Sequence, residues 1–505
     1  MTKKTGFDNE KYLKLQTQAI LKRVKKFDGK LYLEFGGKLL FDYHASRVLP
    51  GFDPNVKMRL LKQLKDDSDI ILCIYAGDIE RKKIRADFGI TYDMDALKLI
   101  DDLKDWGVEV CAVVITRYEN QPSANVFKNK LERQGIKVYT HKFTKGYPTD
   151  VETIVSDEGY GANDHIETKN KLVIVTAPGP GSGKLATCLS QLYHEHKKGT
   201  KAGYAKFETF PIWNLPLKHP VNIAYESATA DLRDYNLLDS FHLDKYNKKS
   251  VNYNRDMEIF PVLKRILEKI MGESMYCSPT DMGVNCAGFG IVDDEAVQEA
   301  AKQEIIRRYF RAKYEYVMGL VDKEAVQRCE LLIEEVGVKS YDRKVVQPAR
   351  DVALESKENS LGHKGVYCGA AIELHDGTII TGKNSSLMHA ASSLILNVLK
   401  HMAEIPDKIP LLSDNIIDFI SILKRDILET KSISLNLDET LISLSISAAT
   451  NPAAKLALEK LKELRGCEVH MTHIPTAGDE VGLRCLGVNL TTDPNFSSKS
   501  FYEVA

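Results

Sequence analysis

Apolar runs alternate with amphipathic segments along the first third of the chain. The runs are continuous and rich in β-branched residues, and they cover residues 70–76, 108–116, 136–141 and 171–176. The segments between them repeat apolar positions at helical spacing and include residues 95–106 and 125–134. Continuous apolar strands separated by helices are buried on both faces, so we expect a doubly wound parallel sheet of the α/β class.

Two segments near the N-terminus precede this alternation. Residues 11–26 have the spacing of an amphipathic helix. Residues 30–42 form two short apolar stretches around Gly36 and Gly37, which predicts a hairpin of two strands.

The middle of the chain changes character. Residues 204–254 are irregular and rich in Pro, Tyr and Asn, as expected of long loops around a ligand site. The residues that follow predict three helices, over 256–271, 294–318 and 323–335.

Strand patterns return after about residue 343. Strands are expected over 366–374, 378–382, 468–472 and 482–490, with helices that begin near residues 385, 413 and 452. We therefore divide the chain into an α/β domain over 1–255, a helical domain over 256–342 and a C-terminal α/β domain over 343–505.

Composition limits the partners and the compartment. The 69 Lys and Arg residues balance the 70 Asp and Glu residues, so a small molecule is a more natural partner than a nucleic acid. The nine cysteines include no C-x-x-C pair, and no apolar run reaches the length of about 18 residues that a membrane span needs. We expect a cytoplasmic protein without a membrane partner, and the sequence is compatible with a homo-oligomer.

A glycine-rich stretch, residues 177–184 (APGPGSGK), joins a strand to a helix. Glycines let backbone N–H groups face a phosphate, and a helix start favours anions. The stretch resembles the P-loop of nucleotide-hydrolysing and nucleotide-kinase enzymes, whose lysine reaches the outer phosphates. It departs from that motif at Pro178, which occupies the first glycine position, and at Leu185, where Ser or Thr would hold magnesium.

The P-loop resemblance implies a set of ligand contacts. The phosphate would be held by Gly179, Gly181, Ser182, Gly183 and Lys184. Thr187 or Ser182 would replace the missing magnesium ligand, and ATP or GTP with Mg²⁺ is the expected cofactor. A tight strand-to-helix turn without any ligand is the plainer interpretation of the same glycines.

Phosphoryl transfer also needs acids that position magnesium and a base that orients the nucleophile. Glu226 follows an apolar stretch as an acid at a strand end would, and Arg255 could neutralise the transferred charge, although a solvated Arg255 beside a helix cap at Asp256 is the simpler interpretation. The polar loop 278–285 offers further contacts, unless it is a simple turn. The catalytic candidates are Lys184, Glu226, Asp231, Arg255 and Asp281, and Asn285 is a candidate ligand contact.

Residues 368–391 resemble the hairpin and helix start of the cytidine-deaminase-like fold. That family places a zinc ligand and a general-acid/base Glu in H-x-E, with P-C-x-x-C downstream. Here His389 matches the ligand position, Ala391 stands at the glutamate position, and no P-C-x-x-C follows. The resemblance implies the scaffold without zinc, and we predict no metal site.

The segment 466–480 gathers histidines and acids at the end of an expected strand. We interpret it as a second pocket, whose candidates are His389, His473, Thr476, Asp479 and Glu480. If Gly478 makes a turn, His473 lies within reach of a carboxylate, which would stabilise its charged imidazolium form. A solvated turn is the alternative.

Three short sequence segments indicate a resemblance to a known family over nearly the whole length of the chain. Residues 251–256 (VNYNRD), 280–285 (TDMGVN) and 472–476 (THIPT) resemble a bacterial family known as domain of unknown function 1846. The resemblance implies a bacterial cytoplasmic protein and transfers no catalytic residue.

Three functional hypotheses follow. The first is a nucleotide-binding enzyme with phosphoryl-transfer or hydrolase activity that uses the Lys184 loop. The second is a regulatory module that holds a phosphorylated metabolite without turnover. The third places non-zinc chemistry in the C-terminal domain, around His389 and His473.

Overall fold

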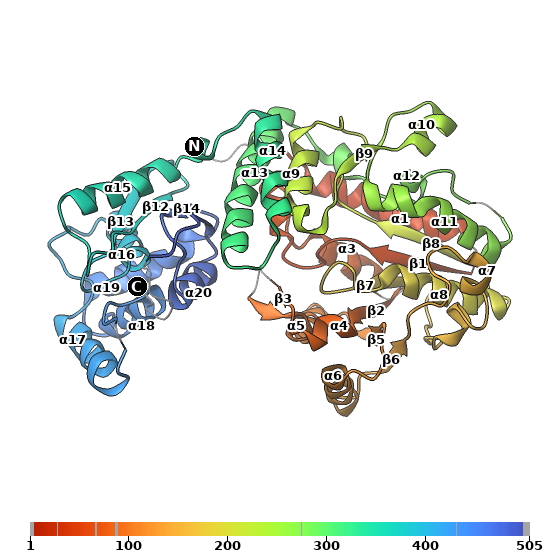
Figure 1. Ribbon diagram of the computed structural model, residues 1–505, viewed down its shortest axis with the longest axis horizontal. Helices are drawn as coiled ribbons and strands as arrows, with labels where there is room; N and C mark the ends of the chain where they lie inside the picture. The colour runs from red at the N-terminus through yellow and green to blue at the C-terminus, as the bar shows by residue number, and fades with distance from the viewer. Residues whose placement is uncertain are drawn as a thin grey trace. The chain divides into compact units, whose positions relative to one another are not determined.

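The computed structural model describes residues 5–27, 29–65, 68–85, 89–273, 275–430 and 432–497. The chain divides into two compact units. The larger unit contains residues 5–229 and 234–301, and the smaller unit contains residues 230–233 and those from 302 onward. The boundary between them falls inside helix α13 (Asp294–Val317) (Figure 1). A division into three independently folding domains stays a prediction.

Seven of the described strands form one parallel sheet in the larger unit, in the order β11-β8-β1-β7-β2-β5-β6. Each neighbouring pair in this sheet is parallel. The strands are β11 (Gly283–Val284), β8 (Ala202–Phe207), β1 (Lys30–Phe35), β7 (Leu172–Thr176), β2 (Ser68–Tyr75), β5 (Val110–Thr116) and β6 (Val138–His141). This confirms an α/β protein with a large parallel sheet.

Both faces of this sheet are covered. Alternate side chains of a strand point to opposite faces. Tyr32 packs in a core cluster with residues of α8 (Lys184–Lys197) and α11 (Asn254–Met271), whereas its neighbours Leu31 and Leu33 point the other way and are equally buried. The continuous apolar character of these strands therefore reflects burial on two sides.

Further helices and strands surround the sheet (Figure 1). The remaining helices of the larger unit are α1 (Asn9–Lys26), α2 (Tyr43–Val48), α3 (Val56–Leu64), α4 (Ala76–Glu80), α5 (Tyr92–Asp105), α6 (Pro122–Arg133), α7 (Val151–Ile154), α9 (Pro220–Ala228), α10 (Ser240–Tyr246) and α12 (Pro279–Met282). Two small antiparallel pairs complete it, β3 (Ile84–Arg85) with β4 (Ile90–Thr91) and β9 (Asn236–Leu238) with β10 (Val251–Tyr253).

The hairpin expected over residues 30–42 is wrong. Only its first half is a strand, β1, and parallel strands occupy both edges of β1, so no edge is left for a hairpin partner. The second half is a loop held by the buried Lys57. The ammonium of Lys57 donates to the carbonyl of Lys38 at 2.9 Å and pairs with Asp42 at 3.0 Å.

The segment 204–254 is more regular than its composition suggests. It contains most of β8 and the elements α9, β9, α10 and β10. The apolar stretch 221–225, expected to lead to an acid at a strand end, belongs to helix α9. Pro220 at the first helical position and the His219 cap start that helix.

The smaller unit has its own sheet and core. Strand β12 (Gly369–Glu373) is antiparallel to β13 (Ile379–Lys383) and to β14 (Glu468–Met471), and β14 is parallel to β15 (Asn489–Thr492). The helices are α14 (Lys323–Val336), α15 (Val346–Glu358), α16 (Ala390–Met402), α17 (Asp414–Ile422), α18 (Leu437–Ser447), α19 (Pro452–Lys460) and α20 (Ala477–Leu486). Leu394 and Val469 are fully buried in this core.

The strand expected over 482–490 is wrong at its start. Residues up to Leu486 belong to α20, which ends at Gly487 in the left-handed conformation, and the strand is β15.

Across the described ranges, no helix combines the length and apolarity that crossing a membrane would require.

Candidate functional site

The carboxyl ends of β1 and β7 lie next to each other where the connections of the large sheet diverge. From β1 the chain continues to β2, beyond β7, whereas from β7 it continues through α8 to β8, beyond β1. Ligands of open parallel sheets bind outside the carboxyl ends of the strands at such a point. The glycine-rich loop, residues 177–183, directly follows β7 and therefore lies at this position.

Internal contacts fix the conformation of the glycine-rich loop. Gly181 and Gly183 have φ values of 70° and 85°, in the left-handed region that favours glycine. The hydroxyl of Ser182 donates to the carbonyl of Gly179 at 2.5 Å, and that of Thr116 on β5 donates to the carbonyl of Ser182 at 2.8 Å. The loop is thus held at both ends of its turn.

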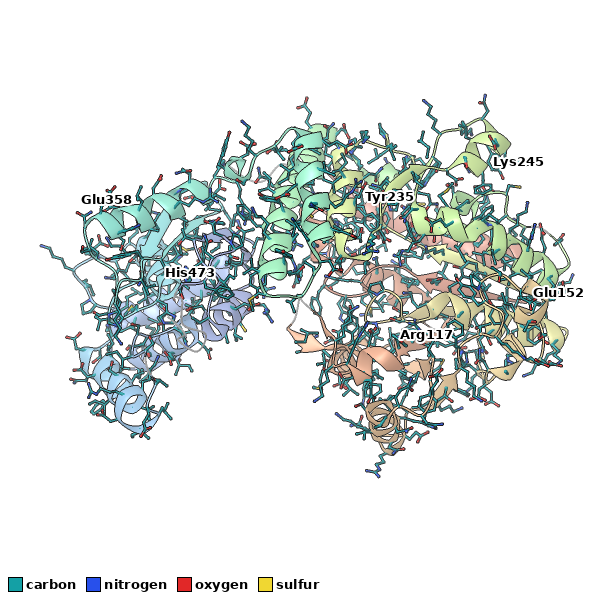
Figure 2. All side chains as sticks on the ribbon, in the orientation of Figure 1. Arg117, Glu152, Tyr235, Lys245, Glu358 and His473 are labelled. Carbon is teal, nitrogen blue, oxygen red and sulfur yellow. The ribbon has the colours of Figure 1, made fainter. Side chains whose placement is uncertain are left out.

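Two cations without a carboxylate partner lie at the loop. Lys184 is the first residue of α8, and neither it nor Arg117 forms an ion pair with any residue that the structure describes. The guanidinium of Arg117, labelled in Figure 2, donates to the carbonyl of Gly181 and lies 3.4 Å from the centre of the Tyr75 ring. A Cβ on Gly181 would meet no atom within 4 Å, so the loop is open to solvent at this residue.

A buried lysine lies among carboxylates at the end of β8. The ammonium of Lys206 lies 2.7 Å from Glu208 and 2.5 Å from Asp256, and it is hydrogen-bonded to the hydroxyl of Tyr253. Burial raises the pKa of Glu208 to about 7; Lys206 opposes this increase, and the nearby charge of Asp256 adds to it. Glu208 is therefore a weaker acid than a solvated glutamate.

Glu34 connects this cluster to the loop. It lies on β1, paired in register with Lys206 on one side and with Val175 of β7 on the other. Its carboxylate is buried and accepts a hydrogen bond of 2.8 Å from the hydroxyl of Tyr204. Neighbouring strands are about 4.8 Å apart, so the loop and the Lys206 cluster belong to one edge of the sheet.

The hydroxyl groups expected to hold magnesium lie inside the protein. Thr187 is fully buried, and its hydroxyl accepts a hydrogen bond from the thiol of Cys73 at 3.5 Å. The hydroxyl of Ser182 is directed to Gly179. In the described part of the chain, no group of three or more His, Cys, Asp or Glu side chains is placed to hold a metal ion.

The remaining catalytic and ligand-contact candidates lie in separate places. Glu226 is buried in α9, where it accepts hydrogen bonds from Asn236. The Asn285 amide donates to the carbonyls of Thr209 and Pro211 at 3.1 Å and so supports a loop. The Asp281 carboxylate, just before β11, accepts from Tyr246 and from the backbone of Cys277, and Asp231 belongs to the smaller unit.

Arg255 is solvated in part, because 46% of its side chain is exposed. It also forms a bidentate pair with the buried Asp234, with contacts of 2.5 and 2.6 Å. Its guanidinium also lies 5.6 Å from the ring centre of Tyr253, which places it beside the Lys206 cluster. Asp256 is in the first turn of α11, and the cap position is Tyr253.

In the smaller unit, His389, Asp479 and Thr476 form a buried network. Nδ1 of His389 lies 2.8 Å from the carboxylate of Asp479, and the hydroxyl of Thr476 donates to the same oxygen at 2.8 Å. The other oxygen of Asp479 accepts from the backbone N–H of Leu437 at 2.8 Å. These contacts hold the pKa of Asp479 below its usual value against the opposing effect of burial.

The expected charged form of His473 is wrong. Burial lowers the pKa of His473 to about 4, because the desolvation of the cation outweighs the attraction of Asp479. The carboxylate of Asp479 is instead used by His389, and Glu480 pairs with Arg484 on the same helix. Of the five residues expected around a second pocket, the structure joins three through hydrogen bonds.

The spacing of this network contains a signal that the sequence analysis missed. Residues 475–479 (PTAGD) keep the spacing of P-C-x-x-C, with Thr476 and Asp479 at the two cysteine positions. In spacing alone, these two residues and His389 correspond to the three ligand positions of the deaminase motif that residues 368–391 resemble. Thr is not a zinc ligand of that motif, and the buried Ala391 replaces its Glu, so the residues present do not fit a catalytic zinc.

Sequence reasoning also missed Arg117, Glu34, Lys206 and Glu208. A charged residue near the end of an otherwise apolar strand was the available signal for Glu34 and Lys206. Arg117 has a φ of 50°, a left-handed conformation that cannot be read from its neighbours in the sequence.

Comparison with known proteins gives a family. Residues 5–337 match the N-terminal model, and residues 341–502 match the C-terminal model, of domain of unknown function DUF1846. Proteins named UPF0371 protein from Clostridium botulinum strains Langeland and Okra are 61% identical over 499 residues, which cover 98% of this chain and 99% of theirs. The UPF0371 protein of strain Alaska E43 is 61% identical over 500 residues, covering 99% of each chain. The chain therefore belongs to the DUF1846 family.

Proposed function

We propose that the larger unit binds a phosphorylated small molecule, such as a nucleotide, at the carboxyl edge of its parallel sheet. The observation that carries this proposal is the pair of cations, Lys184 and Arg117, that flank the glycine-rich loop without a carboxylate partner among the described residues. An anion is the natural partner of two such cations at a helix start.

The contacts of the loop support an anion of phosphate size. The first N–H groups of a helix have no intrahelical acceptor, and those of α8 begin at Lys184. The position of the loop after β7 also supports the proposal, because open parallel sheets bind their ligands at the carboxyl ends of strands whose connections run in opposite directions.

The Lys206 cluster supports an enzyme as a second candidate function. Glu208, whose pKa is raised to about 7 by burial, is a suitable general base for a nucleophile attacking the phosphoryl group. The buried hydroxyls of Ser182 and Thr187 favour the alternative of a regulatory protein, because neither is free to hold magnesium at the loop. We propose cytoplasmic action for either function, in keeping with nine free cysteines.

Titration calorimetry with Lys184→Ala tests the binding proposal. A thermal-shift screen of nucleotides and sugar phosphates first selects the ligand. Loss of one charge-assisted contact, worth about 1.5–3 kcal/mol, then lowers the affinity by roughly ten- to a hundredfold. Lys249→Ala, an exposed lysine of the same unit, is the matched control and keeps the wild-type affinity. Unchanged binding by the folded Lys184→Ala protein would refute the proposal.

Release of phosphate from the selected ligand separates an enzyme from a binding protein. Glu208→Gln keeps the shape of the side chain but cannot accept a proton, so turnover falls while binding persists. If the wild-type chain binds the ligand and releases no phosphate, with or without Mg²⁺, the regulatory function is the correct one.

A further inference from the structure

A pocket of about 330 Å³ lies in the smaller unit, next to the buried network of His389. Its walls include Arg350 and Ala353 of α15, His473 after β14, and Asp493 after β15. This volume is within the range of small-molecule sites, about 300–1,000 Å³. All the residues that line it belong to the smaller unit, so the pocket shares no residue with the phosphate loop.

One buried ring nitrogen of a lining residue has no partner. Nδ1 of His473 is buried and forms no hydrogen bond with any residue that the structure describes. Buried polar atoms are nearly always paired, with protein, water or a ligand. In the neutral ring of His473, Nδ1 is either a donor or an acceptor, depending on the tautomer. A guest that carries a donor and an acceptor side by side can satisfy Nδ1 in either tautomer.

The charges of the pocket cancel each other. The Arg350 guanidinium binds both carboxylate oxygens of Asp493, at 2.6 and 3.0 Å. A charged guest would have to separate this bidentate pair, which a neutral guest leaves intact. The rings of Tyr367 and Phe496 are also part of the lining and offer flat apolar surface.

We propose that this pocket binds a small, flat, uncharged ring compound that bears an amide-type pair of hydrogen-bond donor and acceptor. Its polar edge bonds to the His473 imidazole, and its ring lies against Tyr367 or Phe496. The site is independent of the proposed phosphate site.

Calorimetric and saturation-transfer NMR titrations of the full chain test this proposal. The probes are nicotinamide, uracil and adenine, with nicotinate as the charged counterpart of nicotinamide. We expect at least one uncharged probe to bind, and nicotinate to bind at least tenfold more weakly than nicotinamide. His473→Ala weakens binding at least tenfold, whereas His401→Ala, an exposed histidine on α16, has no effect.

Ala353→Phe provides a second variant if His473→Ala does not fold. Ala353 is a partly exposed helical residue that lines the pocket, so a phenyl ring there fills the space without disturbing the core. Binding should be lost in Ala353→Phe and retained in Lys184→Ala. The proposal is overturned if none of the three uncharged probes binds the wild type, if nicotinate matches nicotinamide, or if the folded Ala353→Phe protein still binds.

Discussion

Arg117, at the proposed phosphate site, has a strained backbone conformation. Its φ of 50° belongs to the left-handed region, where a side chain costs about 1–2 kcal/mol and glycine costs nothing. Such strain persists at functional sites when the surrounding structure fixes it. The stacking on Tyr75 and the bond to Gly181 are the contacts that fix Arg117.

Arg117→Gly should therefore weaken ligand binding while leaving the stability of the fold nearly unchanged. We expect the affinity for a phosphorylated ligand to fall by about tenfold, because one charge-assisted contact is lost. The free energy of unfolding should change by less than about 1 kcal/mol, because the relieved strain offsets the lost stacking. Calorimetric titration and urea denaturation measure the two effects. A variant that binds like the wild type would exclude Arg117 from the site.

The buried His473 makes stability depend on pH. The pKa is about 4 in the folded chain and about 6.5 in an unfolded one, so the unfolded chain binds more protons between these values. Stability is therefore complete above pH 6.5 and falls by about 3 kcal/mol as the pH drops to 4. Urea denaturation across this range should show a shallower slope for His473→Gln than for the wild type. The control His401→Gln should keep the wild-type slope. If His473→Gln also keeps it, the His473 ring is not buried in its neutral form.

At the scale of elements, the junction of β7 and α8 depends on Gly183. A Cβ there would lie 2.8 Å from the Thr116 side chain, in addition to the backbone cost of a φ of 85°. Gly107, after α5, has a φ of 75° but open space around it, so Gly107→Ala shows the backbone cost alone.

We expect Gly183→Ala to destabilise the larger unit more than Gly107→Ala, which should cost about 1–2 kcal/mol. Only Gly183→Ala should also lower the affinity for the phosphorylated ligand, because the clash with Thr116 displaces the start of α8. Denaturation and calorimetric titration of both variants provide the comparison. Equal stabilities would mean that Thr116 moves aside without cost.

At the scale of the whole molecule, the two units have separate cores, and both tryptophans, Trp106 and Trp213, belong to the larger one. Tryptophan fluorescence therefore reports on the larger unit, whereas circular dichroism reports on both. Leu394→Ala removes a fully buried side chain from the smaller core, which costs about 2–5 kcal/mol. The dichroism transition should shift to lower urea while the fluorescence midpoint stays in place. A joint shift would show that the units unfold as one.

The sequence predicts the parts of this molecule whose signals are local. β7 is recognisable because Leu172–Thr176 is apolar throughout, and the glycine-rich loop is contiguous. β8 is harder to recognise because the charged Lys206 interrupts its apolar pattern. The carboxylates that pair with Lys206 lie outside the strand: Glu208 just after its end, and Asp256 far away in the sequence. Register with Glu34 brings that cluster to the loop, and such pairing of distant strands cannot be read from local patterns. For the same reason, the sequence located His389 and Asp479 but not their contact.

The contacts of Asp479 have a consequence for how the smaller unit opens. Its carboxylate binds His389, the residue before α16, and the backbone N–H of Leu437, the first residue of α18, while Asp479 itself lies in the first turn of α20. One side chain therefore joins the starts of three helices that are far apart in the sequence. Fraying of any one of these starts breaks a buried hydrogen bond, so we expect the three helices to open together rather than one by one.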